Sequence, residues 1–518
     1  MASKLTYLKF LKNPVVLLIL ILVLAFVLRV HHLDKEDLEL AESFRYIEAN
    51  TLASSFHVTL NYEEHPPLYN IFLHFWRAVG ESVFILRFSS VLFGIGSVLF
   101  LFLIGKKIFN EKVGLVAALI FTLNPLHINY SQNVEPYSFT IFFTFLSVYF
   151  LIRALGSNRF SHWALFVVAI VIAGYSDHFI LFLLIAITLA IVISFKAYKK
   201  KLKSLLLSGV AISILFIPNI FIGLFQFTFL AESSGFTQLR NPLWYLLIIP
   251  FNLVTLNVGM RSIFFDLNNI PVKSMLIPLL IIMLFFTIFF IKGLLPFKEQ
   301  KEKKLFLLAC FFVPILSLYL MSFFTFMFID PNRFLFVSFP FFILVAKGIT
   351  SVKSKQIFSI LILLLLIIGS VQVYSNFQQH KTQITPITNT IALNYEYGDV
   401  VGVHPQEYLP TFWYYLPEKI PATSFPVHFP LNTYEKYQRH NYNIQEINEE
   451  TIPLFIEYQK NLSQDYDRLW YVAHHARIKK SEMGREGFVL DFLSKNHVLI
   501  LEEESPDGLV GLYLFELT

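Results

Sequence analysis

Ionisable side chains gather in the polar segments between the long apolar runs of this 518-residue chain. The densest group is the sequence EEHPPLY (63–69), which precedes an amphipathic stretch at 70–79. Two consecutive prolines keep the backbone before them extended, so they would hold Glu64 and His65 rigidly where a surface helix begins. A plain turn that starts a membrane-surface helix explains the same pattern.

Further polar groups stand where apolar runs begin or end. Arg87 lies near the start of the second run, which is its outer end, and an ionisable group at membrane depth is a candidate for function unless it reaches to lipid head groups. Three turns carry the remaining candidates: YSQNVEPY (130–137), YSDH (175–178) and DPNRF (330–334). Any one alone could be a helix cap or an interfacial anchor. Together they place acidic, histidine and arginine side chains on one face of the membrane.

This combination of side chains suits reactions on lipid-linked phosphates. Arginines at head-group level can bind a phosphate through paired hydrogen bonds. A nearby carboxylate can deprotonate an acceptor hydroxyl, and an acidic group can stabilise an oxocarbenium-like centre. A cavity open sideways to lipid and upward to water would therefore suit the transfer of a sugar from a polyprenyl phosphate.

The composition indicates that lipid surrounds most of the chain. It is 55% hydrophobic and 15% charged, with a mean hydropathy of +0.60, whereas soluble domains carry about 25% charged residues. The apolar runs predict an all-α bundle of about eleven transmembrane helices rather than a β-barrel. The runs cover residues 14–30, 83–105, 113–128, 137–152, 162–175, 178–195, 204–225, 274–291, 305–328, 334–346 and 356–375.

Basic residues predict the orientation of these helices. The clusters of Lys and Arg fall on one side of the membrane if 226–273 is a long external loop with an interfacial or re-entrant stretch at 243–258. The N-terminus is then cytoplasmic, and the first external loop, 31–82, faces outward with the C-terminal domain. These clusters account for the net charge of +5, so the charge does not indicate nucleic-acid binding. We expect a multi-pass protein of the inner (cell) membrane.

A change of composition near residue 377 predicts a second domain, because charge rises and short or alternating apolar runs replace the long ones. Strands are expected at 399–404, 468–473, 497–502 and 509–517, and helices at 407–416 and 487–493. We therefore expect a transmembrane domain over 1–376 and a soluble, extracytoplasmic α/β domain over 377–518, about 140 residues long. The single cysteine, Cys310, is expected to be a small buried hydrophobe.

The order of these motifs resembles the GT-C membrane glycosyltransferases of the protein-mannosyltransferase and aminoarabinose-transferase type, in the branch that includes the dodecaprenyl-phosphate galacturonosyltransferases. The matching residues run from Leu33 to about Lys347 and include HPPLY (65–69), LRFSS (86–90), YSQ (130–132), Tyr137, His178, Arg333, Phe334 and Pro340. The resemblance implies a GT-C bundle and an inverting transfer of a hexose or pentose. The donor would be a polyprenyl-phosphate sugar, and the acceptor a lipid, glycan or protein at the extracytoplasmic face, as in assembly of the cell envelope.

Two positions depart from the pattern of that family. Its first loop usually has Asp-Glu, with the Asp as the presumed base, where this chain has Ala41 and Glu42. A later motif of the family has an acid and an arginine where this chain has Asn133 and Glu135. Either the base has moved, with Glu42, Glu39 or Glu135 as candidates, or the donor differs, or catalysis is lost. The scaffold residues persist, which favours a shifted role.

We expect carboxylates to carry out the acid–base steps of this reaction. Glu42 acts as the base or orients the acceptor, with Glu135 as its rival. The pattern leaves room for a divalent metal near Glu42 and His65, although it is not a ligand signature. The other expected site residues are Glu39, Glu64, Tyr69, Gln132, Tyr137 and Asp177.

The cationic side chains would hold the donor. Arg87 and Arg333 bind its phosphate with help from His178, while His65 positions the first loop or contacts the phosphate. Two other functions stay open. A transporter or flippase for a lipid-linked glycan would use the same arginines, but the sequence shows neither inverted repeats nor broken helices at mid-membrane. A non-catalytic membrane scaffold, whose C-terminal domain binds a partner, would explain the two departures.

Overall fold

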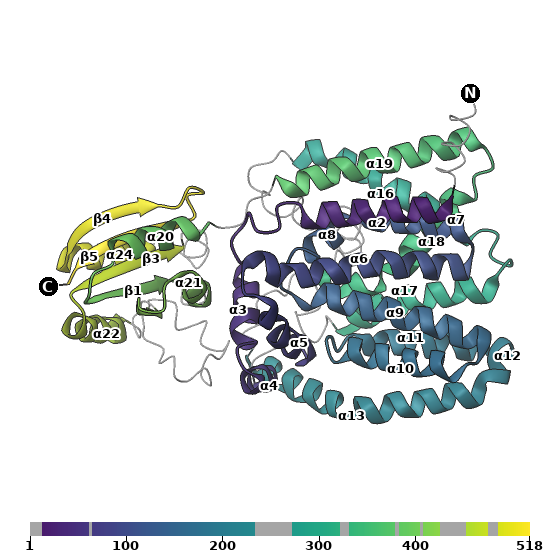
Figure 1. Ribbon diagram of the computed structural model, residues 1–518, viewed down its shortest axis with the longest axis horizontal. Helices are drawn as coiled ribbons and strands as arrows, with labels where there is room; N and C mark the ends of the chain where they lie inside the picture. The colour runs from purple at the N-terminus through teal and green to yellow at the C-terminus, as the bar shows by residue number, and fades with distance from the viewer. Residues whose placement is uncertain are drawn as a thin grey trace. The chain divides into compact units, whose positions relative to one another are not determined.

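The computed structural model describes residues 13–61, 65–233, 272–321, 331–378, 383–404, 408–424, 452–474 and 485–517. The chain forms two compact units, which are described separately (Figure 1). The first unit comprises Met1–Leu33, Glu64–Phe72 and Phe84–Gln379, and the second comprises Asp34–Glu63, Leu73–Val83 and His380–Thr518. The second unit therefore joins most of the first polar loop to the C-terminal part of the chain.

The first unit is a bundle of apolar helices. Its helices are α2 (Pro14–Val30), α6 (Val83–Ile108), α7 (Glu111–Thr122), α8 (Pro125–Tyr130), α9 (Pro136–Ser157), α10 (Phe160–Gly174), α11 (Ile180–Ile193), α12 (Phe195–Tyr198), α13 (Leu202–Ser233), α16 (Val272–Leu294), α17 (Lys301–Met321), α18 (Ser338–Thr350) and α19 (Lys355–Phe377). Two 3-10 helices, η2 (Lys199–Lys201) and η5 (Pro331–Val337), connect some of them. Each apolar run of the sequence overlaps one of these elements, which confirms the prediction of an all-α bundle.

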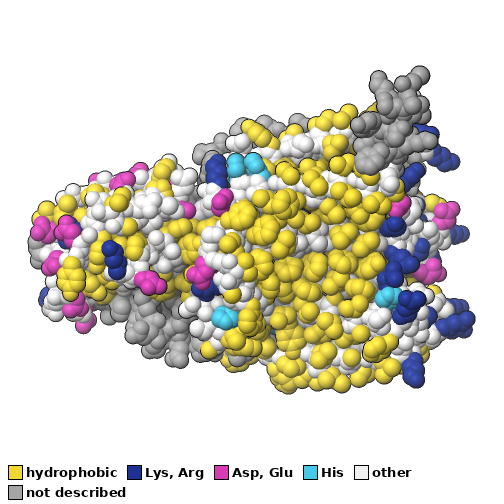
Figure 2. Space-filling view, in the orientation of Figure 1, with side chains coloured by type: hydrophobic (Ala, Val, Ile, Leu, Met, Phe, Trp, Pro, Cys, Tyr) yellow, Lys and Arg dark blue, Asp and Glu magenta, His cyan; other side chains and the backbone are white. Residues whose placement is uncertain are grey.

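Several of these helices have the length and apolar composition of membrane-spanning helices. Among the described residues, six are long and apolar enough to cross one: Val83–Ile108, Pro136–Ser157, Phe195–Gln226, Lys301–Met321, Asn332–Thr350 and Lys355–Phe377. Four shorter apolar helices are Pro14–Val30, Phe160–Gly174, Ile180–Ile193 and Leu280–Leu294. Hydrophobic side chains cover the face of the bundle seen in Figure 2. The chain is thus a multi-pass membrane protein, and the number of crossings stays a prediction. The interfacial stretch expected at 243–258 lies outside the described residues.

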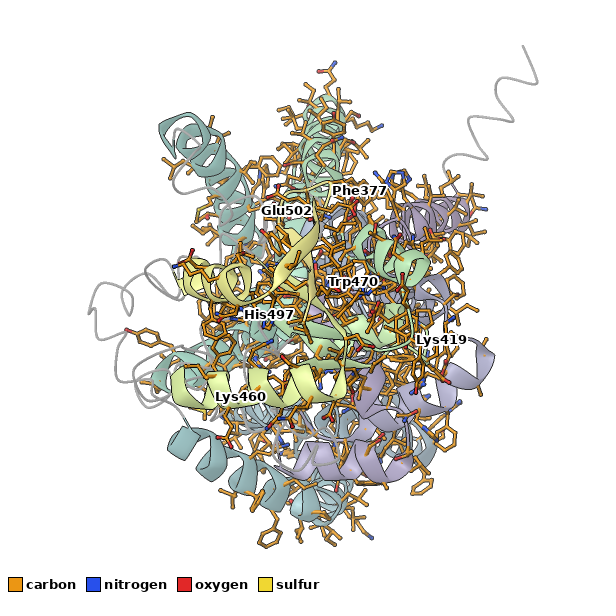
Figure 3. All side chains as sticks on the ribbon, turned by 90° about the vertical axis from the view of Figure 1, so that its left-hand side faces the viewer. Phe377, Lys419, Lys460, Trp470, His497 and Glu502 are labelled. Carbon is orange, nitrogen blue, oxygen red and sulfur yellow. The ribbon has the colours of Figure 1, made fainter. Side chains whose placement is uncertain are left out.

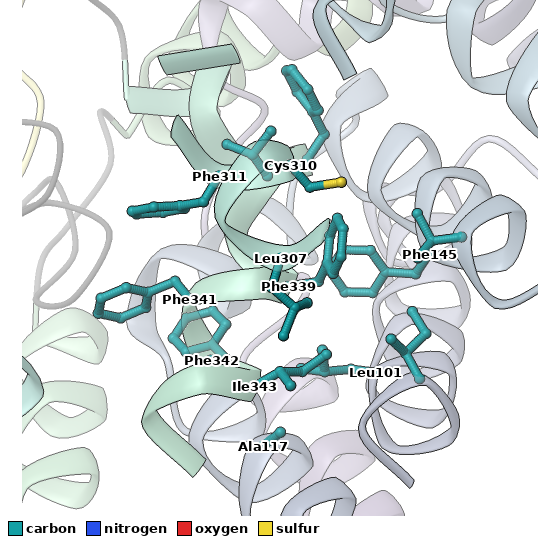
Figure 4. Close-up of a cluster of buried hydrophobic side chains, with 14 of the residues drawn as sticks. Leu101, Ala117, Phe145, Leu307, Cys310, Phe311, Phe339, Phe341, Phe342 and Ile343 are labelled. Carbon is teal, nitrogen blue, oxygen red and sulfur yellow. The ribbon is translucent and has the colours of Figure 1, made fainter. Parts of the chain in front are cut away.

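The interior of the bundle is filled largely by phenylalanine. Phe145, Phe339 and Phe342 are fully buried and share one cluster with Cys310 (Figure 4). The cysteine is therefore a buried hydrophobe, as predicted. Helices α16 and α18 approach so closely that a methyl group on Gly293 or Gly348 would overlap the backbone of the other helix. Small residues permit such contacts between membrane helices.

The second unit contains a mixed five-stranded sheet in the order β2-β1-β3-β5-β4. Its strands are β1 (Asp399–His404), β2 (Ala422–Ser424), β3 (Arg468–His474), β4 (Val498–Glu504) and β5 (Val510–Glu516). Strand β1 pairs in parallel with β2 and β3, whereas β5 is antiparallel to both β3 and β4. Trp470 of β3, labelled in Figure 3, is fully buried, and its Nε1 donates to Asp399 at 2.9 Å. The four predicted strands are confirmed, and the three-residue β2 was not predicted.

Helices from two parts of the sequence belong to the second unit. They are α3 (Leu40–Glu48), α4 (Leu52–Asn61), η1 (Arg77–Val79), α20 (Thr385–Asn394), α21 (Leu409–Tyr415), α22 (Ile452–Asp465) and α24 (Arg485–Asn496), while α5 (Leu68–Trp76) is shared with the first unit. The carboxylate of Asp37 accepts the backbone N–H groups of Ile384 and Thr385, at 2.6 and 2.7 Å, where α20 begins. The hydroxyl of Tyr415 accepts the N–H of Leu38 at 2.7 Å. These bonds attach the start of the first loop to the C-terminal part.

Candidate functional site

The central feature of the helical unit is a contact between His65 and Arg333. The two residues lie 268 positions apart in sequence, yet Nη1 of Arg333 is 3.3 Å from Nε2 of His65. Both side chains are 5% exposed. A guanidinium can only donate, so the Nε2 atom of His65 accepts and its imidazole is neutral. The sequence predicted both residues as site residues, and the structure brings them together.

Helix α13 contributes Gln226, which contacts both His178 and His65. Oε1 of Gln226 lies 2.6 Å from Nε2 of His178, and its Nε2 donates to the backbone carbonyl of His65 at 3.4 Å. Gly223, one turn earlier, makes room for the imidazole of His178, because a Cβ atom there would lie 3.2 Å from Nδ1. Sequence analysis missed Gln226. The available signal was an amide within a long apolar helix.

Burial shifts the ionisation of the two side chains between α10 and α11. It raises the pKa of Asp177 to about 6, although the Arg333 charge and the backbone N–H of Phe179 both lower it. That N–H donates to Oδ1 of Asp177 at 2.9 Å. Burial also lowers the pKa of His178 to about 4, while the Gln226 hydrogen bond raises it and the Arg333 charge lowers it further. His178 is therefore neutral at pH 7 and offers hydrogen bonds rather than charge.

Aromatic rings surround the pair of His65 and Arg333. The ring of Tyr137 meets the imidazole of His65 edge-on, with centroids 5.7 Å apart. Its hydroxyl accepts a hydrogen bond of 2.7 Å from Asn332. Cζ of Arg333 lies 5.3 Å from the ring centroid of Phe179. We use the name "His65–Arg333 cluster" for His65, Tyr137, Asp177, His178, Gln226 and Arg333.

The first unit holds other expected site residues in different surroundings. The buried Arg87 donates to the carbonyl of Leu33 at 2.9 Å. Gln132 donates to the carbonyls of Arg29 and His31, at 3.1 and 2.8 Å, and so satisfies the C-terminal end of α2. Glu135 is buried at the N-cap position of α9, where the helix dipole favours an anion. Tyr69 is buried and its ring packs against Phe72 and Phe139.

Another buried arginine, Arg29, was not predicted from the sequence. Arg29 ends the first apolar run and is fully buried. Its Nε donates to Oγ of Ser131 at 3.2 Å, and its Nη1 donates to the carbonyls of Ala25 and Thr122 at 3.3 and 3.4 Å. A Cβ atom on Gly94 would come within 3.0 Å of Nε of Arg29. These contacts join α2 to α7 and to the turn after α8, which indicates a structural role.

The expected acid–base residues of the first loop lie in the second unit. Glu42 of α3 is fully buried, and its Oε2 accepts the backbone N–H of Glu39 at 2.9 Å. The two residues form a capping box at the start of α3. Glu64 lies outside the described residues. Within the described ranges, no group of three or more His, Cys, Asp or Glu side chains could hold a metal ion.

Comparisons with known proteins give the fold. Residues 64–222 match the family model described as dolichyl-phosphate-mannose-protein mannosyltransferase. ArnT from Cupriavidus metallidurans in the apo state has a TM-score of 0.55 and 12% identity, over 96% of this chain and 97% of that one. The same enzyme bound to undecaprenyl phosphate gives 0.51 and 11%, with the same coverage. The oligosaccharyltransferase AglB from Archaeoglobus fulgidus, in complex with an inhibitory peptide and a dolichol-phosphate, gives 0.53 and 10%, over 98% and 74%. No curated protein matches the chain in sequence.

Proposed function

We propose that the chain transfers a sugar from a polyprenyl-phosphate donor to a lipid, glycan or protein acceptor, because residues 64–222 match a mannosyltransferase family model and the chain shares the fold of ArnT and AglB. The solved structures that share its fold include one with bound undecaprenyl phosphate and one with bound dolichol-phosphate. The reaction is placed at the extracytoplasmic face of the cell membrane, in line with the distribution of basic residues. The sugar is a hexose or a pentose.

The observation that carries this proposal is the buried pair of Arg333 and His65. A guanidinium held in place by an accepting imidazole is oriented before substrate arrives, and its planar donors match the oxygens of a phosphate. Since His178 is neutral at pH 7, Arg333 supplies the positive charge in the His65–Arg333 cluster. We assign two roles to Arg333. It binds the donor phosphate, and it stabilises the negative charge that develops on that phosphate as its bond to the sugar breaks.

The chemistry is a single displacement with inversion at the anomeric carbon. The bond between that carbon and the phosphate oxygen breaks, and the polyprenyl phosphate leaves with the bonding electrons. The acceptor oxygen forms the new bond from the opposite face and gives its proton to a carboxylate. Of the two expected bases we assign this role to Glu135 of α9, which belongs to the same unit as Arg333, and we place Arg87 among the groups that orient the donor.

The proposal is tested by the release of polyprenyl phosphate from radiolabelled polyprenyl-phosphate sugars by the purified protein, with a membrane extract as acceptor. Arg333→Ala should lower kcat/KM at least about a hundredfold, as the loss of an oriented donor to a developing anion does. Arg333→Lys should recover part of the rate, because it restores the charge without the planar fork. The matched control is Arg153→Ala on α9, which removes an arginine bonded to the Tyr149 hydroxyl and should be fully active.

Two results would refute the proposal. One is a wild-type protein that releases no polyprenyl phosphate from any hexose or pentose donor while it moves the intact lipid-linked sugar across a bilayer, which would make it a transporter. The other is an Arg333→Ala variant that melts like the wild type and retains its full rate.

A further inference from the structure

A group of lysines gathers where α6 ends and turns into α7. Nζ of Lys303 donates to the carbonyl of Ile108, the last residue of α6, at 2.6 Å. Nζ of Lys347, in the last turn of α18, lies 5.3 Å from the ring centroid of Phe109 in the same turn. The charges of Lys107 and Lys347 both repel the ammonium of Lys303. Three cations from different helices thus meet at one turn.

Lys304 is the buried member of this group. It is 1% exposed, and its Nζ donates to the carbonyl of Pro296 at 2.7 Å. An ammonium has three donors, of which this carbonyl takes one. The charge of Lys347 repels it, and Glu299 attracts it. A buried ammonium is costly unless an opposite charge compensates it, so Lys304 differs from a lysine that simply reaches into water.

Among the described residues, no carboxylate forms an ion pair with these four lysines, although the charge of Glu299 attracts Lys304. Glu111 is occupied by Lys106, at 2.5 Å. In the described parts of the chain, no carboxylate oxygen lies within 4.0 Å of the four lysines 107, 303, 304 and 347. Figure 2 shows Lys and Arg side chains gathered at one end of the helical unit, next to its hydrophobic face. We therefore expect an anion from outside the chain to neutralise the positive charge of these lysines.

Exposed apolar side chains flank the same lysines. Ile291, Leu295 and Phe297 are 51%, 59% and 36% exposed, and the last two adjoin Pro296, whose carbonyl holds Lys304. A soluble anion would gain nothing from them. An anion that carries acyl chains would cover them and meet the lysines at once.

We propose that Lys107, Lys303 and Lys347 bind the phosphate head group of an anionic phospholipid beside the buried Lys304, and that its acyl chains lie against Ile291, Leu295 and Phe297. The α16–α18 contact at Gly293 and Gly348 fixes the site, because Lys347 precedes one glycine and Pro296 follows the other by three residues. The head group neutralises the lysines and allows Lys304 to stay buried and charged.

The test uses the full-length protein in detergent, with phosphatidylglycerol, phosphatidylcholine or inorganic phosphate added. Bound lipid is counted by native mass spectrometry, and the lipid-induced shift in melting temperature is recorded. Phosphatidylglycerol should bind the wild type and raise its melting temperature, whereas the other two should not. The double substitution Lys303→Gln with Lys347→Gln should weaken phosphatidylglycerol binding at least tenfold. Lys199→Gln with Lys200→Gln in η2 is the control of equal charge and should bind like the wild type.

The double substitution Lys303→Arg with Lys347→Arg distinguishes a specific loss of lipid binding from a general loss of stability. It keeps both charges, so it should retain lipid binding if the proposal holds. Equal losses of binding in the glutamine variant and the η2 control would overturn the proposal, because the attraction would then depend on total charge. An equal thermal shift from inorganic phosphate would overturn it too, because the site would then take a soluble anion.

Discussion

Arg333 keeps its charge where burial makes one neighbour, His178, neutral at pH 7 and makes the ionisation of the other, Asp177, more costly. Burial raises the pKa of Asp177 to about 6 and lowers the pKa of His178 to about 4, while a guanidinium is not deprotonated in proteins. His65 is neutral because its Nε2 accepts from Arg333. At neutral pH the cluster therefore holds the fixed positive charge of Arg333, the carboxylate of Asp177 and several neutral hydrogen-bonding groups.

The raised pKa of Asp177 makes stability depend on pH in a defined direction. Between about pH 4 and pH 6 the folded protein retains a proton on Asp177 that the unfolded chain has released, so stability falls as pH rises through this window. At neutral pH the buried carboxylate costs on the order of 3 kcal/mol. Asp177→Asn should therefore melt above the wild type at pH 7.5, and this advantage should shrink on acidification and vanish near pH 4.

The measurement is the melting temperature of both proteins from pH 4 to pH 8. His178 shifts in the opposite direction, but it is present in both proteins, so the difference isolates Asp177. Asn keeps the oxygen that accepts the N–H of Phe179, which leaves the turn intact. A difference in melting temperature that is constant across this range would show that the ionisation of Asp177 is not coupled to folding.

At the scale of elements, α13 determines where His178 lies. Gly223→Ala would press a methyl group against the imidazole, 3.2 Å from Nδ1, and disturb its hydrogen bond to Gln226. We expect sugar transfer to fall about tenfold, a cost typical of small errors in the placement of a site. Gly209→Ala on the same helix is the control, since its Cβ meets nothing within 4 Å. It should stabilise the helix by about 0.5–1 kcal/mol and leave transfer unchanged.

The rates of sugar transfer by the Gly223→Ala and Gly209→Ala variants test whether the position of His178 matters for the reaction. Both substitutions raise helix propensity equally, so a difference in rate between folded variants reports the contact of the Gly223→Ala methyl group with His178. Equal rates in the two variants would mean that the position of His178 does not matter for transfer.

The helices were predictable because lipid imposes a simple rule on their composition. Each apolar run overlaps a helix of the structure. The polar segments were harder, since α3 and α4 are short and their partners are distant in sequence. Glu39 and Glu42 illustrate this. Their role as candidate bases stays a prediction, while the capping box that their three-residue spacing allows was not predicted.

Side-chain contacts across long sequence distances were only partly predictable. His65 and Arg333 were both selected because ionisable groups are rare at membrane depth, but nothing in the sequence indicated that they touch. Gln226 was missed because an amide stands out less than a charge in an apolar helix. Arg29 was missed because it ends an apolar run, and its bonds to Ser131 and to the carbonyl of Thr122 depend on how the helices pack.

At the scale of the whole molecule, the expected site residues divide between the two units. The His65–Arg333 cluster, Arg87 and Glu135 belong to the helical unit, while Glu39 and Glu42 belong to the unit that contains the sheet. The first loop was expected to be part of the transmembrane domain. The structure instead attaches its helices to the C-terminal part through Asp37 and Tyr415. Of the two carboxylates expected as the base, Glu42 therefore belongs to the unit that contains the sheet and Glu135 to the helical unit.

Arg333 is the group to which we assign the binding of a prenyl-linked phosphate. The most direct test is the equilibrium affinity of the purified protein for polyprenyl phosphate, measured in lipid nanodiscs for the wild type, Arg333→Ala and the Arg153→Ala control. We expect the first substitution to weaken binding at least about tenfold, equivalent to about 1.4 kcal/mol, and the control to bind like the wild type. Equal affinity in all three proteins would contradict the account.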